Sequence, residues 1–424
     1  MRNFFDKIFF RSNNLDYING SIKKLTKNSR AYLIFDAINS YNSKSEIRYV
    51  GGCLRKIINN EKVEDIDLAT NLIPDQVCNA LKKQNIDFFE SGKTHGTITA
   101  IIEDFKFEIT SLREDVSTDG RHAKVKFSQD WKEDAQRRDF TINSIYADSE
   151  GNLFDPFNGK VDLKKGNIRF IGDPDKRIRE DYLRILRYIR FFLDYSKNKH
   201  DSEIIKKIKI NIGGVQKLSK ERLYDELKKM IRFDSIEKFS KDRQSQELIS
   251  MIFPELRNLN IFSKLNSYQK KLLKDADFIL LLSLMIIDET DNADYFLYKF
   301  NISKKDQNRI KIIDKFYKEK INSRTFSETS MNKFFYYNGR QSIIDILSFN
   351  IIRSKKFDKN LIDLIENYKT KIIPEMPIKA NEIMNKYQIS EGKQLGLKLR
   401  QIEEEWVRND FNISDQQVDI IVKN

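Results

Sequence analysis

Glycine and proline become scarce beyond about residue 175, and this uneven distribution constrains the fold more than any other feature of the sequence. Both residues interrupt helices, so their scarcity favours long helical segments there. Between residue 46 and about 160, short apolar runs instead alternate with turns, as in IRYVGG, VEDIDLAT, TITAII and FKFEIT. Such runs predict strands, and the last two predict a hairpin. The sequence therefore predicts an α+β protein, with an α/β head followed by an all-helical region.

The same pattern predicts four parts: a helical lead-in with a helix at AYLIFDAINS, a head domain, a helical neck, and a helical body with a tail. Their expected bounds are 1–45, 46–160, 161–235 and 236–424. In the neck, EDYLRILRYIRFFLD and KERLYDELKKMIRF have helical periodicity. The apolar run FILLLSLMII at 278–287 is shorter than the roughly 20 residues of a membrane span, so it predicts a buried helix.

The charge balance favours a polyanionic partner. The chain carries 76 Lys and Arg against 63 Asp and Glu, a formal net charge of +13. Cys53 and Cys78 are too few for a disulfide framework or a thiolate zinc site, which indicates a reducing compartment. The basic start, MRNFFDKIFFRSNN, is typical of transit peptides, but it contains Asp6 and no obvious cleavage site. We therefore expect a cytoplasmic protein, with the mitochondrial matrix as the alternative.

Two aspartates stand one residue apart in the predicted strand VEDIDLAT. Side chains alternate between the faces of a strand, so Asp65 and Asp67 are expected to point the same way, opposite Ile66 and Leu68. Neighbouring carboxylates repel each other unless a cation lies between them, and Mg²⁺ binds through one or two carboxylates plus substrate phosphates. Glu108, on the strand FKFEIT, is a candidate third carboxylate. Alone, a D-x-D pair in a soluble protein usually belongs to a solvated surface.

A glycine pair ends the predicted strand IRYVGG. A turn of this kind lets backbone N–H groups approach a phosphate closely, and a following helix N-terminus favours an anion. Arg55, three residues past Gly52, could reach the same anion with two hydrogen bonds. The G-K-[ST] ending of a P-loop is missing. An ordinary strand-to-helix turn with a solvent-facing arginine is therefore the alternative.

Two arginine-rich stretches follow, EDAQRRDFTINSIYAD at 133–148 and GDPDKRIREDYLRILRYIRFF at 172–192. If the second is helical, Asp181 and Arg184 lie one turn apart on one face. A carboxylate only accepts hydrogen bonds and a guanidinium only donates them, so the pair complements the edge of adenine or cytosine. Guanine and uracil present a carbonyl oxygen where the carboxylate needs a donor. The alternative is a basic amphipathic helix that packs its leucines inward.

Taken in order, these motifs resemble those of class II tRNA nucleotidyltransferases, a family that includes CCA-adding enzymes and bacterial poly(A) polymerases. The resemblance covers residues 46–235 and ends with SKERLYDELKKMI. One departure is Lys56, where the family commonly has an aspartate. The matching motifs are Gly51-Gly52-x-x-Arg55, Asp65-x-Asp67, Arg137-Arg138-Asp139-Phe140-Thr141-Ile142-Asn143 and Glu180-Asp181-x-x-Arg184-x-x-Arg187.

This resemblance implies a fold that consists of a polymerase-β-like head and a helical region. It also implies that the reaction is Mg²⁺-dependent nucleotidyl transfer to an RNA 3′-OH. It further implies a role for each matching residue, and it makes Glu108, on a strand where the family usually has an acidic residue, a further catalytic carboxylate. The implied roles are Mg²⁺ binding by Asp65 and Asp67, triphosphate contact by Gly52 and Arg55, ribose 2′-OH contact by Arg138 and Asp139, base reading by Asp181 and Arg184, and support of nucleotide binding by Arg187 and Arg190.

The family divides between CCA addition and poly(A) synthesis. The segment from SGKTHGTITAII to STDGRHAKV resembles the CCA-adding version, because of its Gly-Thr strand and the loop at 119–122. The resemblance therefore implies template-independent addition of CCA to tRNA from CTP and ATP, with a poly(A) polymerase as the alternative. The helical remainder is expected to bind the tRNA. We expect no membrane association and infer no stable protein partner.

Two other classes of function fit the sequence less well. His200-Asp201 is the start of a phosphohydrolase metal site in other proteins, but the chain has only three histidines, too few for such a site. A non-catalytic RNA-binding module would explain the basic charge and leave the paired aspartates unexplained. Release of pyrophosphate separates a binder from an enzyme.

Overall fold

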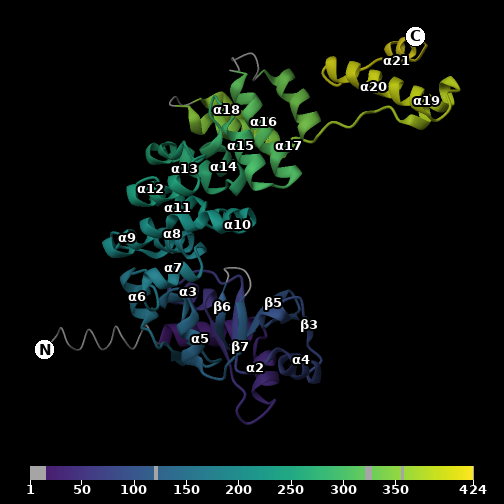
Figure 1. Cartoon of the computed structure of the whole chain (residues 1–424). Coiled ribbons are helices and arrows are strands. Elements are labelled where there is room, and N and C mark those ends of the chain that lie inside the picture. The colour runs from purple at the N-terminus through teal and green to yellow at the C-terminus, as the bar shows by residue number, and fades with distance from the viewer. Residues whose placement is uncertain (1–15, 119–122, 320–326, 355–357, 424) are drawn as a thin grey trace. The chain divides into compact units, whose positions relative to one another are not determined.

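The computed structural model describes residues 16–118, 123–319, 327–354 and 358–423 (Figure 1). The chain divides into two compact units, residues 1–230 and 231–424. The predicted boundary between neck and body, at residue 235, lies close to this division, and the finer four-part division remains a prediction. In the described part of the lead-in, residues 16–28 are helical and helix α2 follows at Tyr32–Asn39, as AYLIFDAINS predicted.

A seven-stranded mixed sheet forms the head of the first unit, in the order β3-β4-β5-β2-β1-β8-β9. Only β2 and β5 run parallel among these neighbours, and the β4–β5 hairpin is the one predicted. The strands are β1 (Ile47–Val50), β2 (Ile66–Thr70), β3 (Asp87–Phe89), β4 (Thr97–Ile102), β5 (Phe105–Ser111), β8 (Tyr146–Ala147) and β9 (Leu153–Phe154).

Apolar layers cover both faces of this sheet. On one face, helices α2, α3 (Gly52–Ile58) and α4 (Pro74–Lys83) pack with alternate strand residues such as Leu68 and Phe107, both fully buried. On the other face, Ala69 packs with residues of helix α5 (Trp131–Arg137). Asp67 lies between Ile66 and Leu68 and therefore points away from the α2–α4 layer. The period-two pattern thus predicted the correct side for Ile66, Asp67 and Leu68.

A separate hairpin, β6 (Arg113–Thr118) and β7 (Ala123–Phe127), follows the sheet strands. The loop Asp119-Gly120-Arg121-His122, which carried the resemblance to CCA-adding enzymes, lies outside the described residues.

The rest of the first unit is helical, and one expectation about it was wrong. The stretch 172–192 is not one helix: α7 ends at Glu180, and Asp181 has an extended backbone with φ −153° and ψ 107°. Its side chain accepts a hydrogen bond from the Leu183 N–H (3.1 Å), a local bond that competes with helix formation. The helices are α6 (Gly159–Lys165), α7 (Pro174–Glu180), α8 (Leu183–Tyr195), α9 (Ser202–Asn211) and α10 (Lys220–Met230).

The second unit consists of helices, so the predicted fold class is confirmed. The run FILLLSLMII forms α14, in which every residue after Phe278 is buried, as expected. No helix among the described residues is long and apolar enough to cross a membrane. The helices are α11 (Phe233–Phe239), α12 (Arg243–Ile252), α13 (Ser267–Lys274), α14 (Phe278–Ile286), α15 (Asn292–Phe300), α16 (Lys304–Lys318), α17 (Glu328–Arg353), α18 (Lys359–Thr370), α19 (Ala380–Tyr387), α20 (Lys393–Arg408) and α21 (Asp415–Lys423).

Candidate nucleotide-binding cavity

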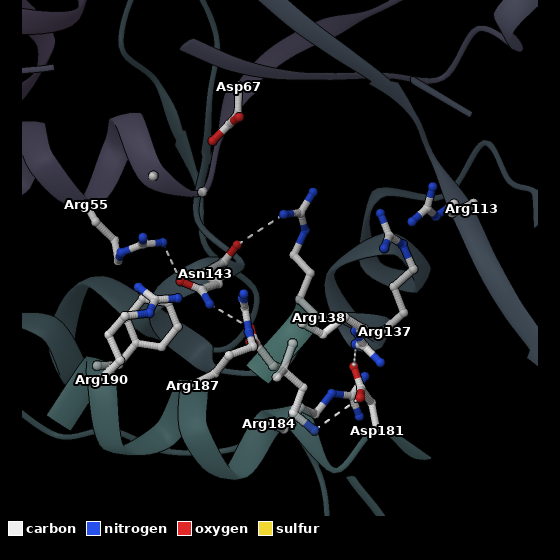
Figure 2. A pocket seen from close by; sticks show the side chains of 16 residues that line it. Arg55, Asp67, Arg113, Arg137, Arg138, Asn143, Asp181, Arg184, Arg187 and Arg190 are labelled. Carbon is white, nitrogen blue, oxygen red and sulfur yellow. Dashed lines mark hydrogen bonds and ion pairs between the residues drawn. The ribbon is translucent and has the colours of Figure 1, made fainter. Parts of the chain in front are cut away.

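A cavity of about 520 Å³ in the first unit brings together most of the residues singled out in the sequence (Figure 2). Eight arginines and three aspartates line it, so its walls carry a surplus of positive charge. Such a surplus suits a polyanion of the size of a nucleoside triphosphate. The lining residues are Gly51, Gly52, Arg55, Asp67, Arg113, Arg137, Arg138, Asp139, Asn143, Asp181, Leu183, Arg184, Arg187, Arg190, Phe191 and Arg222.

The glycine pair forms the turn from β1 into α3, at the wall of the cavity. Gly51 has φ +69°, a backbone conformation that L side chains rarely adopt. A Cβ atom at Gly52 would lie only 3.3 Å from Oδ2 of Asp67. The turn therefore needs glycine at its first position for conformation and at its second for the close approach of the Asp67 carboxylate.

The three candidate carboxylates lie near one another at one end of the parallel strand pair. Asp67 and Glu108 are register partners in β2 and β5, and Asp65 stands in a bend directly before β2 rather than inside the strand as predicted. Burial, together with the charge of Asp65, raises the pKa of Asp67 above its ordinary value. Burial and the two aspartates likewise raise the pKa of Glu108. Asp67 lines the cavity, and Asp65 and Glu108 do not.

Nearby arginines only partly offset the repulsion among these carboxylates. Among the described residues, none of the three carboxylates forms an ion pair, although Arg138 and Arg55 lower the pKa of Asp67 from a distance. The described side chains also include no cluster of three or more His, Cys, Asp or Glu close enough to hold a metal ion. Mg²⁺ typically binds through one or two carboxylates, together with water and substrate phosphates, so a site for it does not require three such side chains.

Arg138 is anchored at the cavity wall by Asp134, a residue that the sequence reasoning did not single out. Asp134 is almost fully buried and receives hydrogen bonds from Arg138 Nη2 (3.0 Å) and the Tyr146 hydroxyl (2.6 Å). Burial alone would raise the pKa of Asp134, but Arg138 and Arg137 hold it well below its ordinary value. This carboxylate is therefore charged and fixes the two arginines.

Asp139 is the centre of a second network. Its carboxylate accepts hydrogen bonds from Arg187 Nε (2.6 Å) and Asn143 Nδ2 (2.6 Å), and Arg55 donates to the Asn143 side-chain oxygen. Burial opposes ionisation of Asp139, but the Arg187 guanidinium lowers its pKa overall. Asn143 was quoted as part of a motif without a role. It connects Arg55 of α3 to Asp139, residues that lie far apart in the sequence.

Asp181 and Arg184 both line the cavity, but Asp181 lies outside the helix α8 that carries Arg184, and not one helical turn before it. The break at Asp181 turns its carboxylate to Arg222 of α10, whose Nη2 lies 2.8 Å from Oδ2. Arg184 instead binds Glu180 and the main-chain oxygen of Arg177 (2.7 Å). Arg222 belongs to the quoted stretch SKERLYDELKKMI, yet nothing in the sequence indicated that it reaches this cavity.

Comparison with known proteins gives the same picture as the geometry. The family model described as Poly A polymerase head domain matches residues 47–169. A mouse protein named CCA tRNA nucleotidyltransferase 1, mitochondrial, is 32% identical over 88% of this chain and 85% of its own length. A CCA-adding enzyme of Staphylococcus haemolyticus is 31% identical over 80% and 82%. The Bacillus stearothermophilus CCA-adding enzyme in complex with CTP superposes with a TM-score of 0.63 at 19% identity, covering 89% of this chain and 92% of that one.

The head and its arginine-lined cavity therefore define a nucleotidyltransferase, an enzyme with a mixed-sheet catalytic head and a helical region. Since the mouse relative exceeds 30% identity over most of both chains, the chain belongs to the CCA tRNA nucleotidyltransferase family. The family resemblance drawn from the motifs is confirmed.

Proposed function

We propose that this protein adds the 3′-terminal CCA to tRNA from CTP and ATP, by nucleotidyl transfer with release of pyrophosphate. The observation that carries the proposal is the similarity to CCA enzymes over more than four-fifths of the chain, together with a cavity that contains the matching motifs. The relatives named above are CCA enzymes, so the proposal favours CCA addition over the poly(A) alternative.

In this proposal the cavity binds the nucleoside triphosphate through its cations. Gly52 and Arg55 contact the triphosphate, Arg138 and Asp139 contact the ribose 2′-OH, and Arg187 and Arg190 support binding. The fixed positions of Arg138 and Asp139 favour this assignment, because ion pairs hold both side chains where a hydroxyl could donate and accept.

Asp65 and Asp67 are proposed to hold Mg²⁺, with Glu108 beside them. The donor set fits, since carboxylate oxygens without a protein counter-ion are what a hard divalent cation requires. When bound, the metal would supply charge stabilisation for the attacking 3′-OH and the departing pyrophosphate. The protein's own contribution is to keep Asp67 in place, because the backbone N–H of Gly52 donates a hydrogen bond to the Asp67 carboxylate. Glycine at position 52 also leaves room for this carboxylate, since a Cβ atom there would crowd it.

Asp181 and Arg184 are proposed to read the base. In the structure Arg222, which also lines the cavity, holds Asp181, and Glu180 holds Arg184. An incoming base must therefore compete for these groups. Only a base edge that satisfies both the acceptor and the donor replaces the hydrogen bonds that it breaks, which favours adenine and cytosine.

The helical second unit is proposed to bind the tRNA, in line with the relatives' substrate. The expected compartment remains the cytoplasm, with the mitochondrial matrix as the alternative that the name of the mouse relative favours. Fractionation of cells that express the tagged full-length chain decides between the two compartments. Co-purification with the matrix fraction would replace the cytoplasmic expectation.

The test of the activity is a nucleotide-addition assay on a tRNA transcript that lacks its CCA end, resolved to single nucleotides. Mg²⁺ is present with CTP alone, ATP alone or both, and an unstructured RNA is the control. The proposal expects two additions with CTP alone and three with both nucleotides. Long ladders of A on either RNA would identify a poly(A) polymerase, and no addition under any condition would remove the proposal.

A further inference from the structure

The ring of Phe191 lies at the meeting point of three arginines in the cavity. The guanidinium carbon of Arg190 is 4.2 Å from the ring centroid, that of Arg55 is 4.8 Å away and that of Arg187 is 5.4 Å away. All three distances are within the roughly 6 Å over which a ring face attracts a cation. Phe191 lines the cavity but is only 1% exposed.

The three arginines differ in their other partners. Arg187 is paired with Asp139, and Arg190 is paired with Glu226, which is 3% exposed. Arg55 forms no ion pair with any carboxylate in the described part of the chain, and its Nε is buried there without a hydrogen-bond partner. Its guanidinium rests between the amide oxygen of Asn143, the Phe191 ring and the Tyr195 ring, whose centroid is 5.7 Å away.

An aromatic ring and a carboxylate hold an arginine in different ways. A carboxylate fixes the guanidinium and also cancels its charge, so little attraction is left for an incoming anion. A ring face fixes the guanidinium through its quadrupole and leaves the full positive charge. The aromatic platform therefore keeps Arg55 both ordered and unneutralised.

We propose that Phe191 is a positioning residue that acts through Arg55 and orders its uncancelled charge for the polyphosphate of the incoming nucleotide. This inference rests on the proposed nucleotide-binding function and deepens it. It places the ring's effect on the phosphate side of the substrate and not on the base. Affinity for ATP and CTP should then depend on the ring equally, and discrimination against GTP and UTP should not depend on it.

The sharpest test replaces Phe191 of the full-length chain with mono-, di- and trifluorinated phenylalanine, which weaken the ring quadrupole at nearly constant shape. Binding of ATP, inorganic tripolyphosphate and AMP is measured by calorimetry. We expect the affinities for ATP and tripolyphosphate to fall stepwise, reaching about tenfold with three fluorines, and the affinity for AMP to change little. The same series at Phe296, which is fully buried with no cation over its ring among the described residues, is the matched control.

A double-mutant cycle then tests whether the effect passes through Arg55. The KM for ATP should rise about tenfold in Phe191→Leu with a smaller change in kcat, and the double variant Phe191→Leu, Arg55→Met should be no worse than Arg55→Met alone. Affinities that do not follow the fluorine series, or additive effects in the cycle, overturn the inference and leave the proposed function intact. A wild-type chain that binds neither ATP nor tripolyphosphate overturns both.

Discussion

Arg309 in the second unit and Arg55 in the cavity are both largely enclosed guanidinium groups, yet their surroundings are opposite. Arg309 is held by two carboxylates, with Nε 2.8 Å from Asp345 and Nη1 2.6 Å from Asp277. Arg55 is held by an amide oxygen and two aromatic rings. The charge of Arg309 is cancelled inside the protein, and the charge of Arg55 is left for a ligand.

The acidic side chains repeat this contrast. Asp277 and Asp345 share Arg309, whereas Asp65, Asp67 and Glu108 stand together without an ion pair in the described residues. A fold selected for stability alone would match such charges, and one that must bind a charged substrate keeps some unmatched at a cost in stability. The comparison therefore separates charges that are matched within the fold from charges that we propose act on the substrate.

The largest expected effect is at the unmatched carboxylates. Asp67→Asn removes the charge at nearly constant size and should lower the rate of nucleotide addition at least about 1,000-fold, because metal-assisted charge stabilisation is worth several kcal/mol. The free energy of unfolding should stay constant or rise, because burial and Asp65 both disfavour the charged form of Asp67. Single-turnover addition of ATP to a tRNA ending in CC gives the rate, and urea unfolding gives the stability.

The matched control is Asp104→Asn, an exposed aspartate in the turn between β4 and β5. Its rate and stability should both equal those of the wild-type protein. Normal turnover in Asp67→Asn would remove the metal assignment for this residue, and a large loss of stability would show that its charge serves the fold.

In the second unit we expect a charge change to lower the stability of the protein, which is the opposite of the expectation for Asp67→Asn. Arg309→Ala leaves two carboxylates unpaired, one of them on Asp345, which is 1% exposed. Breaking a buried pair by removing one partner costs about 3–5 kcal/mol of unfolding free energy. Urea unfolding, followed by tryptophan fluorescence and circular dichroism, measures the loss.

The exposed pair of Lys315 and Glu319, 3.8 Å apart, provides the control for Arg309. Lys315→Ala should change the unfolding free energy by less than about 0.5 kcal/mol, because solvent screens exposed ion pairs. If Arg309→Ala and Lys315→Ala lose similar amounts of unfolding free energy, the ion pairs of Arg309 contribute no more to stability than an exposed ion pair does.

Much of the head was predictable from the sequence because its information is local. The two faces of a strand follow from alternation, so the placement of Ile66 and Leu68 opposite Asp67 and the hairpin of β4 and β5 were expected correctly. The break at Asp181 was missed. Its causes are a short-range side-chain bond to Leu183 and an ion pair with Arg222 from another helix, and periodicity detects neither of them.

The candidate site was predictable as a set of residue types and not as a set of partners. The motifs brought Arg55, Arg138, Asp139 and Arg187 to attention, and all four line one cavity. The pairing of Arg187 with Asp139 joins segments far apart in the chain, and so does the pairing of Arg222 with Asp181. The uncancelled charge of Arg55 therefore became visible only in three dimensions.

A smaller effect is expected at Arg184, which is paired with Glu180 and must leave that ion pair to bind a nucleotide base. Arg184→Ala removes one half of the proposed base-reading pair, so the preference for ATP and CTP over GTP and UTP should fall roughly 10- to 100-fold, the equivalent of one hydrogen bond to a charged group. Competition between nucleotides in the addition assay measures the preference.

Arg179→Ala, on the exposed surface of α7 and absent from the cavity wall, is the control and should keep the preference. Unchanged selectivity in Arg184→Ala would remove the base-edge hypothesis.

The smallest effect concerns a matched pair inside the cavity itself. The folded state lowers the pKa of Asp139, so this carboxylate stabilises the protein above the ordinary aspartate pKa of about 3.9 and loses that contribution as the pH falls toward the lowered value. Asp139→Asn keeps a hydrogen-bond acceptor without the charge and should lower the unfolding free energy by about 1 kcal/mol at pH 7. The difference from wild type should narrow below about pH 4, as urea unfolding at several pH values will show. If the difference in unfolding free energy instead stays constant with pH, Asp139 stabilises the protein through shape and hydrogen bonding and not through its charge. The ion pair between Asp139 and Arg187 would then add no electrostatic stability, and the contrast with the unpaired Arg55 would fail.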